Sequence, residues 1–317
     1  MKRFKNILVL CDDDSIAVSA FDRVSWLAQA NGARVTLVDV IEAGPTEMMQ
    51  MFAALGRSRG ADIAERVFEA RRARLEELAA VLRARGTEAE VALDTGTAFI
   101  EVIRRVLRDG HDLVVKSRQG SVSAPLLLSD DMHLLRKCPC PVWIFNTRLE
   151  ARARRIMAAV DPDPDDPVRD ALNHTVMQLA TSLAEQDDAW LDVVNVWALQ
   201  EEMTLRHSSF AKVSDAEVDL LVEREEARSA ERFRALTDDF AAHFDRMRLL
   251  HLKGAAADIL ADHAETEAID TLVMGSVART GIAGLFIGNT AETVLAQVKC
   301  SILTVKPEGF VSPVSPE

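Results

Sequence analysis

The chain contains the same kind of segment twice, and this duplication limits what it can fold into. Residues 6–12 read Asn-Ile-Leu-Val-Leu-Cys-Asp, and residues 155–161 read Arg-Ile-Met-Ala-Ala-Val-Asp, so both are apolar runs that end in aspartate. A second pair of segments, Cys140–Phe145 and Cys300–Val305, also agrees in the order and type of its residues. The 317 residues are also about twice the common size of a single domain. We therefore predict two domains built on one plan.

Within each half, short apolar runs alternate with stretches of helical periodicity, which is the pattern of a parallel sheet covered on both faces. The predicted fold class is α/β, with two tandem Rossmann-like, doubly wound domains, each a five-stranded parallel sheet with helices on both faces. The strands are predicted near residues 6–11, 34–41, 89–93, 112–116 and 141–146 in the first half, and near 155–160, 190–197, 247–252, 270–275 and 301–306 in the second.

The predicted domain boundary lies in the polar segment Arg148–Arg154, which separates the last strand of one half from the first strand of the next. The first domain is predicted to span 1–148 and the second 149–310, followed by a tail at 311–317. The first half carries 21 basic and 20 acidic side chains and the second 16 and 30, so their net charges are +1 and −14. The net charge of −13 argues against nucleic acid and anionic membranes as partners.

The four cysteines are too few for a disulfide scaffold, and we interpret them as mostly buried thiols. Cys138 and Cys140 lack the companion ligands that a zinc site requires, so no metal is predicted. The apolar run near the N-terminus stops after five residues at Asp12-Asp13-Asp14, which predicts a strand and not a leader or membrane segment. These features predict a cytoplasmic protein.

Candidate binding residues lie where strands end, because open parallel sheets bind ligands beyond the carboxyl ends of their strands. The fourth strand of the second half is followed by a segment rich in glycine and hydroxyl residues. Two glycines there let the backbone approach a phosphate, three polar side chains can donate hydrogen bonds, and one arginine supplies a cation. These candidates are Gly275 and Gly288, Ser276, Asn289 and Thr290, and Arg279.

This segment resembles the ATP-binding segment of the universal stress protein family, which has glycine, two residues, glycine, nine residues, then glycine with serine or threonine. Gly275 and Gly288 match the first and third glycines, whereas Ala278 and Asn289 depart from the pattern. The whole chain resembles the tandem members of the E type. The resemblance implies a non-catalytic stress-response module that binds ATP or a related adenine nucleotide in its C-terminal domain, with Asp161 near the adenine.

Other functions stay open. Asn289 and Glu292 fit a capping box that would fill the helix N-terminus from within, which favours a nucleotide-independent scaffold. The methionine-rich segment 45–60 and its counterpart 199–213 could instead cover an apolar ligand or pack the two domains together. An adenine-nucleotide hydrolase would need a glycine-rich serine loop after the first strand, but Asp12–Ser15 and Asp161–Asp165 are acidic there.

The first half departs further from the family pattern. Lys116 and Gln119 stand in the glycine places, and Ser129-Asp130-Asp131 precedes the helix, so we predict a degenerate site. Stand-alone family members pair through their last strands, which implies that Val142–Phe145 and Ile302–Val305 pair within one chain; a homodimer is the other arrangement considered.

Two further clusters contain residue types that bind metals. His243, His251 and His263, near Asp258 and Asp262, fall on different predicted elements, so we interpret them as surface histidines. The acidic segment Asp161–Asp166 is interrupted by prolines and lacks the glycine of a calcium loop, so it is predicted to be a turn that caps the next helix.

Overall fold

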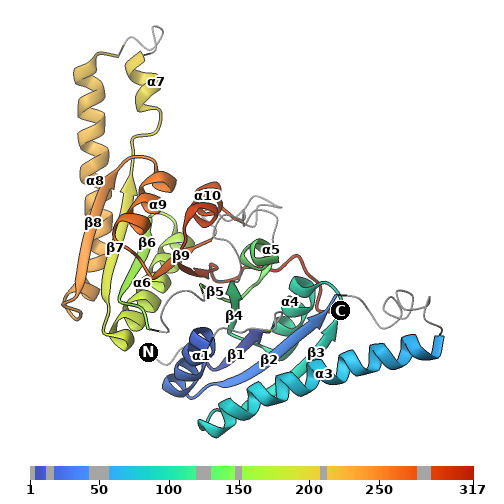
Figure 1. Ribbon diagram of the computed structural model, residues 1–317. Coiled ribbons are helices and arrows are strands. Elements are labelled where there is room, and N and C mark those ends of the chain that lie inside the picture. The colour runs from blue at the N-terminus through green and yellow to red at the C-terminus, as the bar shows by residue number, and fades with distance from the viewer. Residues whose placement is uncertain are drawn as a thin grey trace. The chain divides into compact units, whose positions relative to one another are not determined.

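The computed structural model describes residues 4–11, 18–42, 57–118, 130–146, 152–207, 213–276 and 287–317 (Figure 1). Its contacts divide the chain into two compact units. The first contains Met1–Arg152, Ser301–Thr304 and Phe310–Glu317, and the second contains Ala153–Cys300 and Val305–Gly309. Each unit is an α/β sheet with helices on both faces, so the predicted tandem α/β fold class is confirmed. The predicted five parallel strands per domain are wrong for the second unit, which has four among its described residues, because β10 pairs antiparallel with β5 of the first unit.

The first unit has five parallel strands in the order β3-β2-β1-β4-β5. The central strand β1 is completely buried, as expected for a strand with helices on both of its faces. The helix α4 contacts α5. The elements are β1 (Asn6–Leu10), α1 (Val18–Asn31), β2 (Arg34–Ile41), α3 (Arg57–Ala84), β3 (Ala89–Thr95), α4 (Ala98–Asp109), β4 (Leu113–Arg118), α5 (Asp130–Lys137) and β5 (Val142–Asn146).

The second unit repeats this plan, with parallel strands in the order β9-β6-β7-β8. The helices α6 and α8 contact each other, as do α9 and α10. Because parallel crossovers are right-handed, the first pair covers one face of the sheet and the second pair covers the other. The elements are β6 (Arg155–Val160), α6 (Pro167–Asp187), β7 (Trp190–Trp197), α7 (Glu202–His207), α8 (Asp215–Ala241), β8 (Met247–Lys253), α9 (Ala256–Thr266), β9 (Thr271–Gly275), α10 (Asn289–Gln297) and β10 (Ser301–Val305).

The two units share a hydrogen-bonding device that fixes their equivalent positions. The carboxylate of Asp112 accepts from the backbone N–H groups of Lys5 and Asn6, and the carboxylate of Asp270 accepts from those of Arg154 and Arg155. Both aspartates precede the fourth strand of their repeat and hold it against the first strand. Asp112 is therefore equivalent to Asp270, and the strand bounds agree with the predicted ones to within two residues throughout.

The last strand of the chain belongs to the first unit by its contacts. The strand β10 pairs antiparallel with β5, with Ile302 opposite Ile144, Leu303 opposite Trp143 and Thr304 opposite Val142. The side chain of Ser301 extends this pairing, because its Oγ accepts from the backbone N–H of Asn146 at 3.0 Å. This ladder confirms the prediction that the last strands of the two repeats pair, and it covers an edge of β5 that would otherwise offer unpaired backbone groups.

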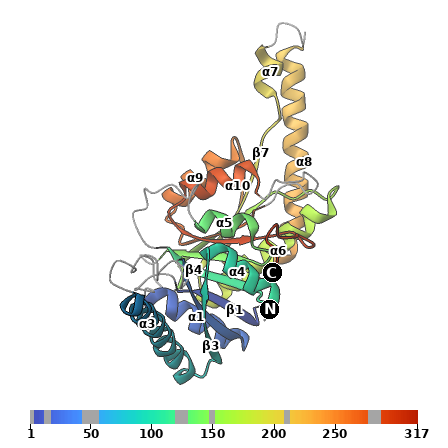
Figure 2. The same ribbon diagram turned by 90° about the vertical axis from the view of Figure 1, so that its right-hand side faces the viewer.

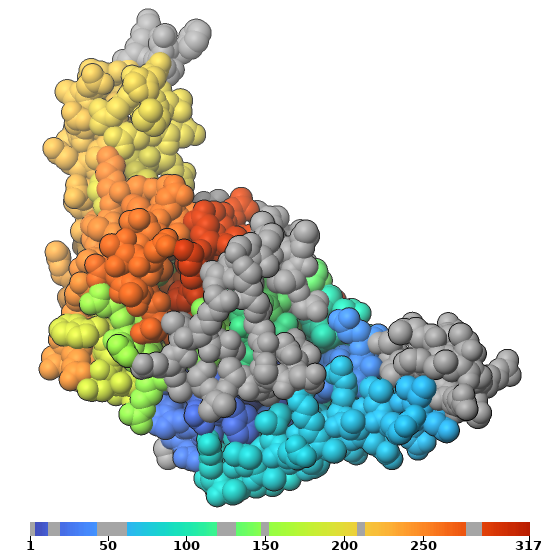
Figure 3. Space-filling view, viewed as in Figure 1, coloured from blue at the N-terminus to red at the C-terminus, as the bar shows by residue number. Residues whose placement is uncertain are grey.

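In the second unit, α7 and the first part of α8 extend beyond the sheet, as the turned ribbon view shows (Figure 2). The atoms of this segment are yellow in the space-filling view (Figure 3). Ser214 and Glu217 form a capping box that begins α8. The segment 199–213, predicted to cover a ligand or to pack the domains, contains α7, and Met203 on it is 68% exposed. Of its counterpart 45–60, residues 45–56 lie outside the described residues and 57–60 begin α3. In the described part of the chain, no helix combines the length and apolar character needed to cross a membrane.

Candidate functional site

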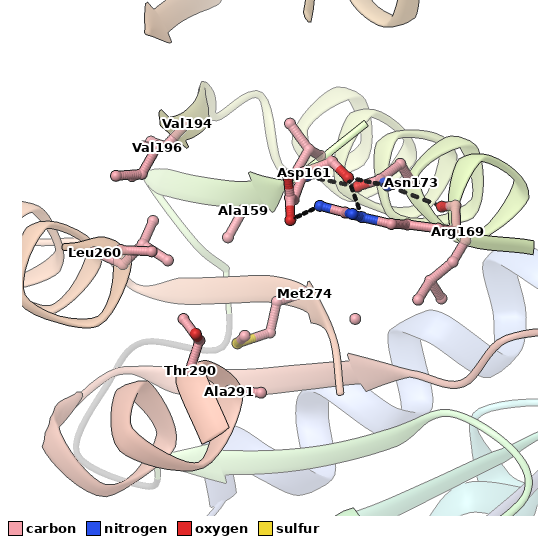
Figure 4. Close-up of a pocket in the computed structure, with 14 residues that line it drawn as sticks. Ala159, Asp161, Arg169, Asn173, Val194, Val196, Leu260, Met274, Thr290 and Ala291 are labelled. Atoms are coloured by element: carbon pink, nitrogen blue, oxygen red, sulfur yellow. Dashed lines mark hydrogen bonds and ion pairs between the residues drawn. The ribbon is translucent and has the colours of Figure 1, made fainter. Parts of the chain in front are cut away.

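A pocket in the second unit lies at the place where an open parallel sheet is expected to bind a ligand. The strands β6 and β9 are neighbours in the sheet. The chain leaves β6 toward β7 on one side of this pair and leaves β9 toward the opposite side, so the switch point of the sheet lies between β6 and β9. The pocket has a volume of about 160 Å³ (Figure 4). It is lined by Ala159, Val160, Asp161, Arg169, Leu172, Asn173, Val194, Val196, Ala256, Leu260, Met274, Gly275, Thr290 and Ala291.

One end of the pocket is a polar cluster around the end of β6 (Figure 4). Asp161 forms an ion pair with Arg169, and its carboxylate remains 67% exposed. Asn173 fixes the backbone beneath it, because its Oδ1 accepts from the N–H of Asp161 at 2.8 Å and its Nδ2 donates to the carbonyl of Asp161 at 2.9 Å. Asp161 is thus held on a rigid turn with its carboxylate accessible. Sequence reasoning missed Arg169 and Asn173, although both lie in the first two turns of the helix that the acidic segment caps.

The other end of the pocket is the start of α10, where Thr290 and Ala291 line the wall. The predicted capping box of Asn289 and Glu292 is wrong. The cap residue is Gly288, which has no side chain to bond the helix N–H groups. The helix begins one residue earlier than predicted, so Glu292 lies one position too far along to complete a box, and its own N–H donates to the carbonyl of Gly288. The cap residue itself therefore offers no side chain to the first-turn N–H groups of α10, and a helix N-terminus of this kind can attract an anion.

The middle of the pocket is apolar and depends on a glycine. Met274 at the end of β9 lies between the two polar ends (Figure 4). At the next position, a Cβ on Gly275 would lie 2.7 Å from Cδ2 of Leu172. A side chain there would have to displace the Leu172 side chain of α6, so the glycine suits the close packing of α6 on β9, which is a reason distinct from the phosphate contact that the sequence suggested.

The remaining predicted residues lie beside the pocket. Ser276 is completely buried, and its hydroxyl contacts Nζ of Lys306 at 2.7 Å and the carbonyl of Val305 at 3.4 Å. The backbone of Ser276 ties the start of α10 to β9, since its carbonyl accepts from the N–H of Gly288. Asn289 is exposed on the first turn of α10. Arg279 and Ala278 lie outside the described residues. Lys306 was not predicted, and a lysine at the end of an apolar strand is the signal that could have revealed it.

The acidic segment after β6 is held by arginines. Asp166 caps α6 by accepting from the N–H groups of Val168 and Arg169, as predicted. Asp163 pairs with Arg169 and Arg232, so its carboxylate is already engaged by cations. A second, polar hollow of about 440 Å³ adjoins this segment and shares Asp161, Arg169 and Val196 with the first pocket.

The equivalent place in the first unit contains an ion pair. Because Asp112 is equivalent to Asp270, the residue equivalent to Gly275 is Ser117, which corrects the sequence alignment that put Lys116 there. Lys116 is equivalent to Met274, and it pairs with Asp131 at 2.8 Å. Both side chains are nearly buried, at 12% and 11% exposure. Gln119 and Ser129 lie outside the described residues, as does Asp12.

The position equivalent to Asp131 in the second unit is Ala291. The N–H of Cys138 donates to the carbonyl of Leu134, and that of Val298 donates to the carbonyl of Val294, so the two helices end in the same way. This equivalence places Met274 and Ala291, both in the pocket wall, where the first unit has a lysine and an aspartate.

The histidines considered as metal ligands have separate partners. His243 contacts the carbonyl of Asp239, His251 contacts Ser229, and His263 contacts the carboxylate of Asp192. The interpretation of His263 as a surface residue is wrong, because its side chain is only 14% exposed. Among the described residues, no three or more His, Cys, Asp or Glu side chains gather in a way that could hold a metal ion.

Comparison with known proteins gives matches over the whole chain. The model described as "Universal stress protein family" matches residues 3–146 and again 152–306. The chain is 27% identical over 321 residues to universal stress protein E of Escherichia coli K12, which covers 99% of this chain and 98% of that protein. It is 24% identical over 328 residues to the protein of that name from Photorhabdus laumondii, with the same coverage of both chains.

Among solved structures, a functionally unknown protein of Pseudomonas aeruginosa PAO1 aligns with a TM-score of 0.73 at 24% identity, covering 97% of this chain and 94% of that one. A universal stress protein from Archaeoglobus fulgidus aligns with a TM-score of 0.62 at 16% identity, covering 97% and 98%. At these identities the structural matches support the tandem fold alone.

Proposed function

The chain belongs to the universal stress protein family, and from this premise we propose that it is a stress-response module whose second repeat binds ATP or a related adenine nucleotide without catalysing a reaction. The observation that carries the proposal is the pocket at the switch point of the second sheet. It has an exposed carboxylate at one end and a helix N-terminus with a glycine cap at the other. An apolar wall lies between them.

The residues present fit the parts of a nucleotide. A pocket of about 160 Å³ is similar in volume to a cavity of about 150 Å³ that accepts benzene, so it suits an aromatic base and not a whole nucleotide. The base would lie against Val194, Val196 and Leu260, with the exposed carboxylate of Asp161 near the adenine. The phosphates would lie at the first turn of α10 beside Thr290, where the N–H groups of a helix N-terminus favour negative charge.

Isothermal titration of the full chain with ATP, ADP and AMP tests the proposal. We expect saturable binding of one nucleotide per chain, because the first repeat has the Lys116–Asp131 ion pair in the place of the pocket wall. Thr290→Val should weaken binding by about tenfold, because it removes a hydroxyl group of the protein that would form a hydrogen bond with the charged ligand. Thr293→Val is the matched control, because Thr293 is on the same helix and its hydroxyl donates to the carbonyl of Asn289.

The same titration separates the alternatives. Retention of nucleotide without release of ADP or AMP supports a binding module, whereas steady release would contradict the non-catalytic part of the proposal. Saturable binding of a small apolar probe, without any nucleotide binding, would favour the apolar-ligand function, which the valine and leucine side chains in the wall also suit. An absence of binding by any nucleotide would leave the protein a scaffold.

A further inference from the structure

Two thiols of the first unit lie in contact between α5 and β5. Cys138 and Cys140 are separated by Pro139, and their Sγ atoms are 3.6 Å apart. The N–H of Cys138 donates to the carbonyl of Leu134 at 2.9 Å, which fixes the first thiol to the end of α5. Cys138 is completely buried, whereas Cys140 is partly exposed. Of the two residues, Cys140 is therefore the one nearer to solvent, and the Cys138 thiol is in contact with it.

We propose that Cys138 and Cys140 are a redox-modification site, at which a small peroxide such as hydrogen peroxide converts the two thiols into a reversible disulfide. The sulfur atoms need to approach by only about 1.5 Å to reach a disulfide bond length. Zinc is a poorer occupant, because two thiolates supply half of a tetrahedral site. The described residues provide no group of three or more suitable ligands.

The reaction balances in two steps. The thiolate of Cys140 attacks one oxygen of hydrogen peroxide, which breaks the O–O bond and leaves a sulfenic acid on Cys140. The departing hydroxide takes up the proton that the Cys140 thiol released and becomes one water molecule. The thiolate of Cys138 then attacks the Cys140 sulfur, the S–S bond forms, and the hydroxyl group leaves as a second water molecule with the proton of Cys138. Both sulfurs are oxidised and the peroxide is reduced.

The surroundings predict a slow oxidation that accelerates in alkali. The hydrogen bond with Cys138, burial and the nearby Asp112 carboxylate all raise the pKa of Cys140. Because the thiolate is the reactive form, the rate should rise with pH by up to about tenfold per unit below that pKa. The product encloses a single residue, so it removes little entropy from the unfolded chain and should be reduced again easily.

The site lies at the start of a strand that holds the first unit together. Pro141, directly after Cys140, accepts from the N–H of Val114 at 3.0 Å, and β5 then pairs with both β4 and β10. A bond between the two sulfurs would therefore constrain the connection between α5 and β5, a strand that is paired on both sides.

The test is to treat the reduced full-length chain with hydrogen peroxide at mildly alkaline pH and to count its thiols in denaturant. We expect the count to fall from four to two, with a loss of about 2 Da in the intact mass, and dithiothreitol should restore both values. After trypsin digestion the bond should lie within one peptide that begins at Cys138. A count that stays at four, an oxidised Cys140 carrying extra oxygen, or a dimer linked through Cys140 would overturn the proposal.

Two variants keep the result specific. The double variant Cys11→Ser/Cys300→Ser removes the other two thiols and should lose its remaining two at the rate of the parent protein. Cys138→Ser retains the Cys140 thiol but lacks its partner, so peroxide should leave a sulfenic acid that dimedone traps, with no internal bond. Circular dichroism of both variants verifies that each is folded before oxidation.

Discussion

The double variant Met274→Lys/Ala291→Asp should lose nucleotide affinity by at least about 100-fold, or about 2.7 kcal/mol, while the protein remains folded. The two substitutions copy Lys116 and Asp131 into the equivalent positions of the second repeat. In the first unit these side chains pair at 2.8 Å and are nearly buried. Met274 and Ala291 both line the pocket, so the copied pair would occupy the space proposed for the ligand. Titration with ATP and thermal unfolding measure the two expectations.

The single variants show whether the pair itself is the cause. Ala291→Asp alone places a negative charge at the start of α10 and should repel phosphate. Met274→Lys alone leaves a cation facing an anionic ligand, so it should weaken binding less than the pair does. The reverse exchange in the first repeat, Lys116→Met/Asp131→Ala, is the matched control and should leave the affinity of the second repeat unchanged. A folded double variant that binds ATP as tightly as the parent protein would contradict both the proposed pocket and its assignment.

The fold was predictable from sequence because its strands are buried on both faces. Runs such as Ile7–Leu10 must be apolar throughout, so their positions and their duplication can be recognised without any knowledge of contacts. Helix starts were less predictable. Asn289 and Glu292 have the spacing of a capping box, but the helix begins one residue earlier, after Gly288, whose N–H donates to the carbonyl of Ser276. Local spacing cannot reveal a hydrogen bond to a distant strand.

The candidate site was predictable only in part, for a related reason. Asp161 and Thr290 follow strands in the sequence, and the sheet brings them to one pocket. The ion pair of Lys116 with Asp131 joins residues on different elements. The sequence comparison aligned Lys116 with Gly275, one residue away from its structural equivalent Met274. Residue types thus identified the correct edge of the sheet, whereas the identity of each wall residue required the strand pairing.

A second large effect is expected at the opposite end of the same sheet, where Asp192 is the centre of a buried charge network. Its side chain is completely buried on β7. Arg248 donates to its Oδ1 at 2.7 Å and His263 contacts its Oδ2 at 3.0 Å. Glu267 also pairs with Arg248. Asp192→Asn removes the charge at the centre and leaves the arginine and histidine without their carboxylate. Arg248 is 37% exposed and keeps Glu267 as a partner, so its charge is not left buried and unpaired. The second unit should lose about 2 kcal/mol, because hydrogen bonds to a charged group contribute about that much.

Urea unfolding at neutral pH and in acid tests this expectation. Burial acts to raise the pKa of Asp192, but the hydrogen bonds from Arg248 and His263 outweigh it, so the pKa lies below its usual value. The carboxylate therefore stabilises the fold above the unfolded pKa of about 4, and this contribution is lost as the pH falls through the lower folded pKa. The difference between parent and Asp192→Asn should be largest at neutral pH and should shrink in acid.

The matched control is Asp188→Asn, whose carboxylate pairs with Arg246 near the same end of β7 but is 81% exposed. Water and salt screen such a pair, so this variant should unfold at the urea concentration of the parent protein. Equal urea midpoints for Asp192→Asn and Asp188→Asn at neutral pH would mean that the buried ion pairs of Asp192 stabilise the fold no more than the exposed pair of Asp188. A larger loss for Asp192→Asn that persists unchanged in acid would assign the effect to packing and not to charge.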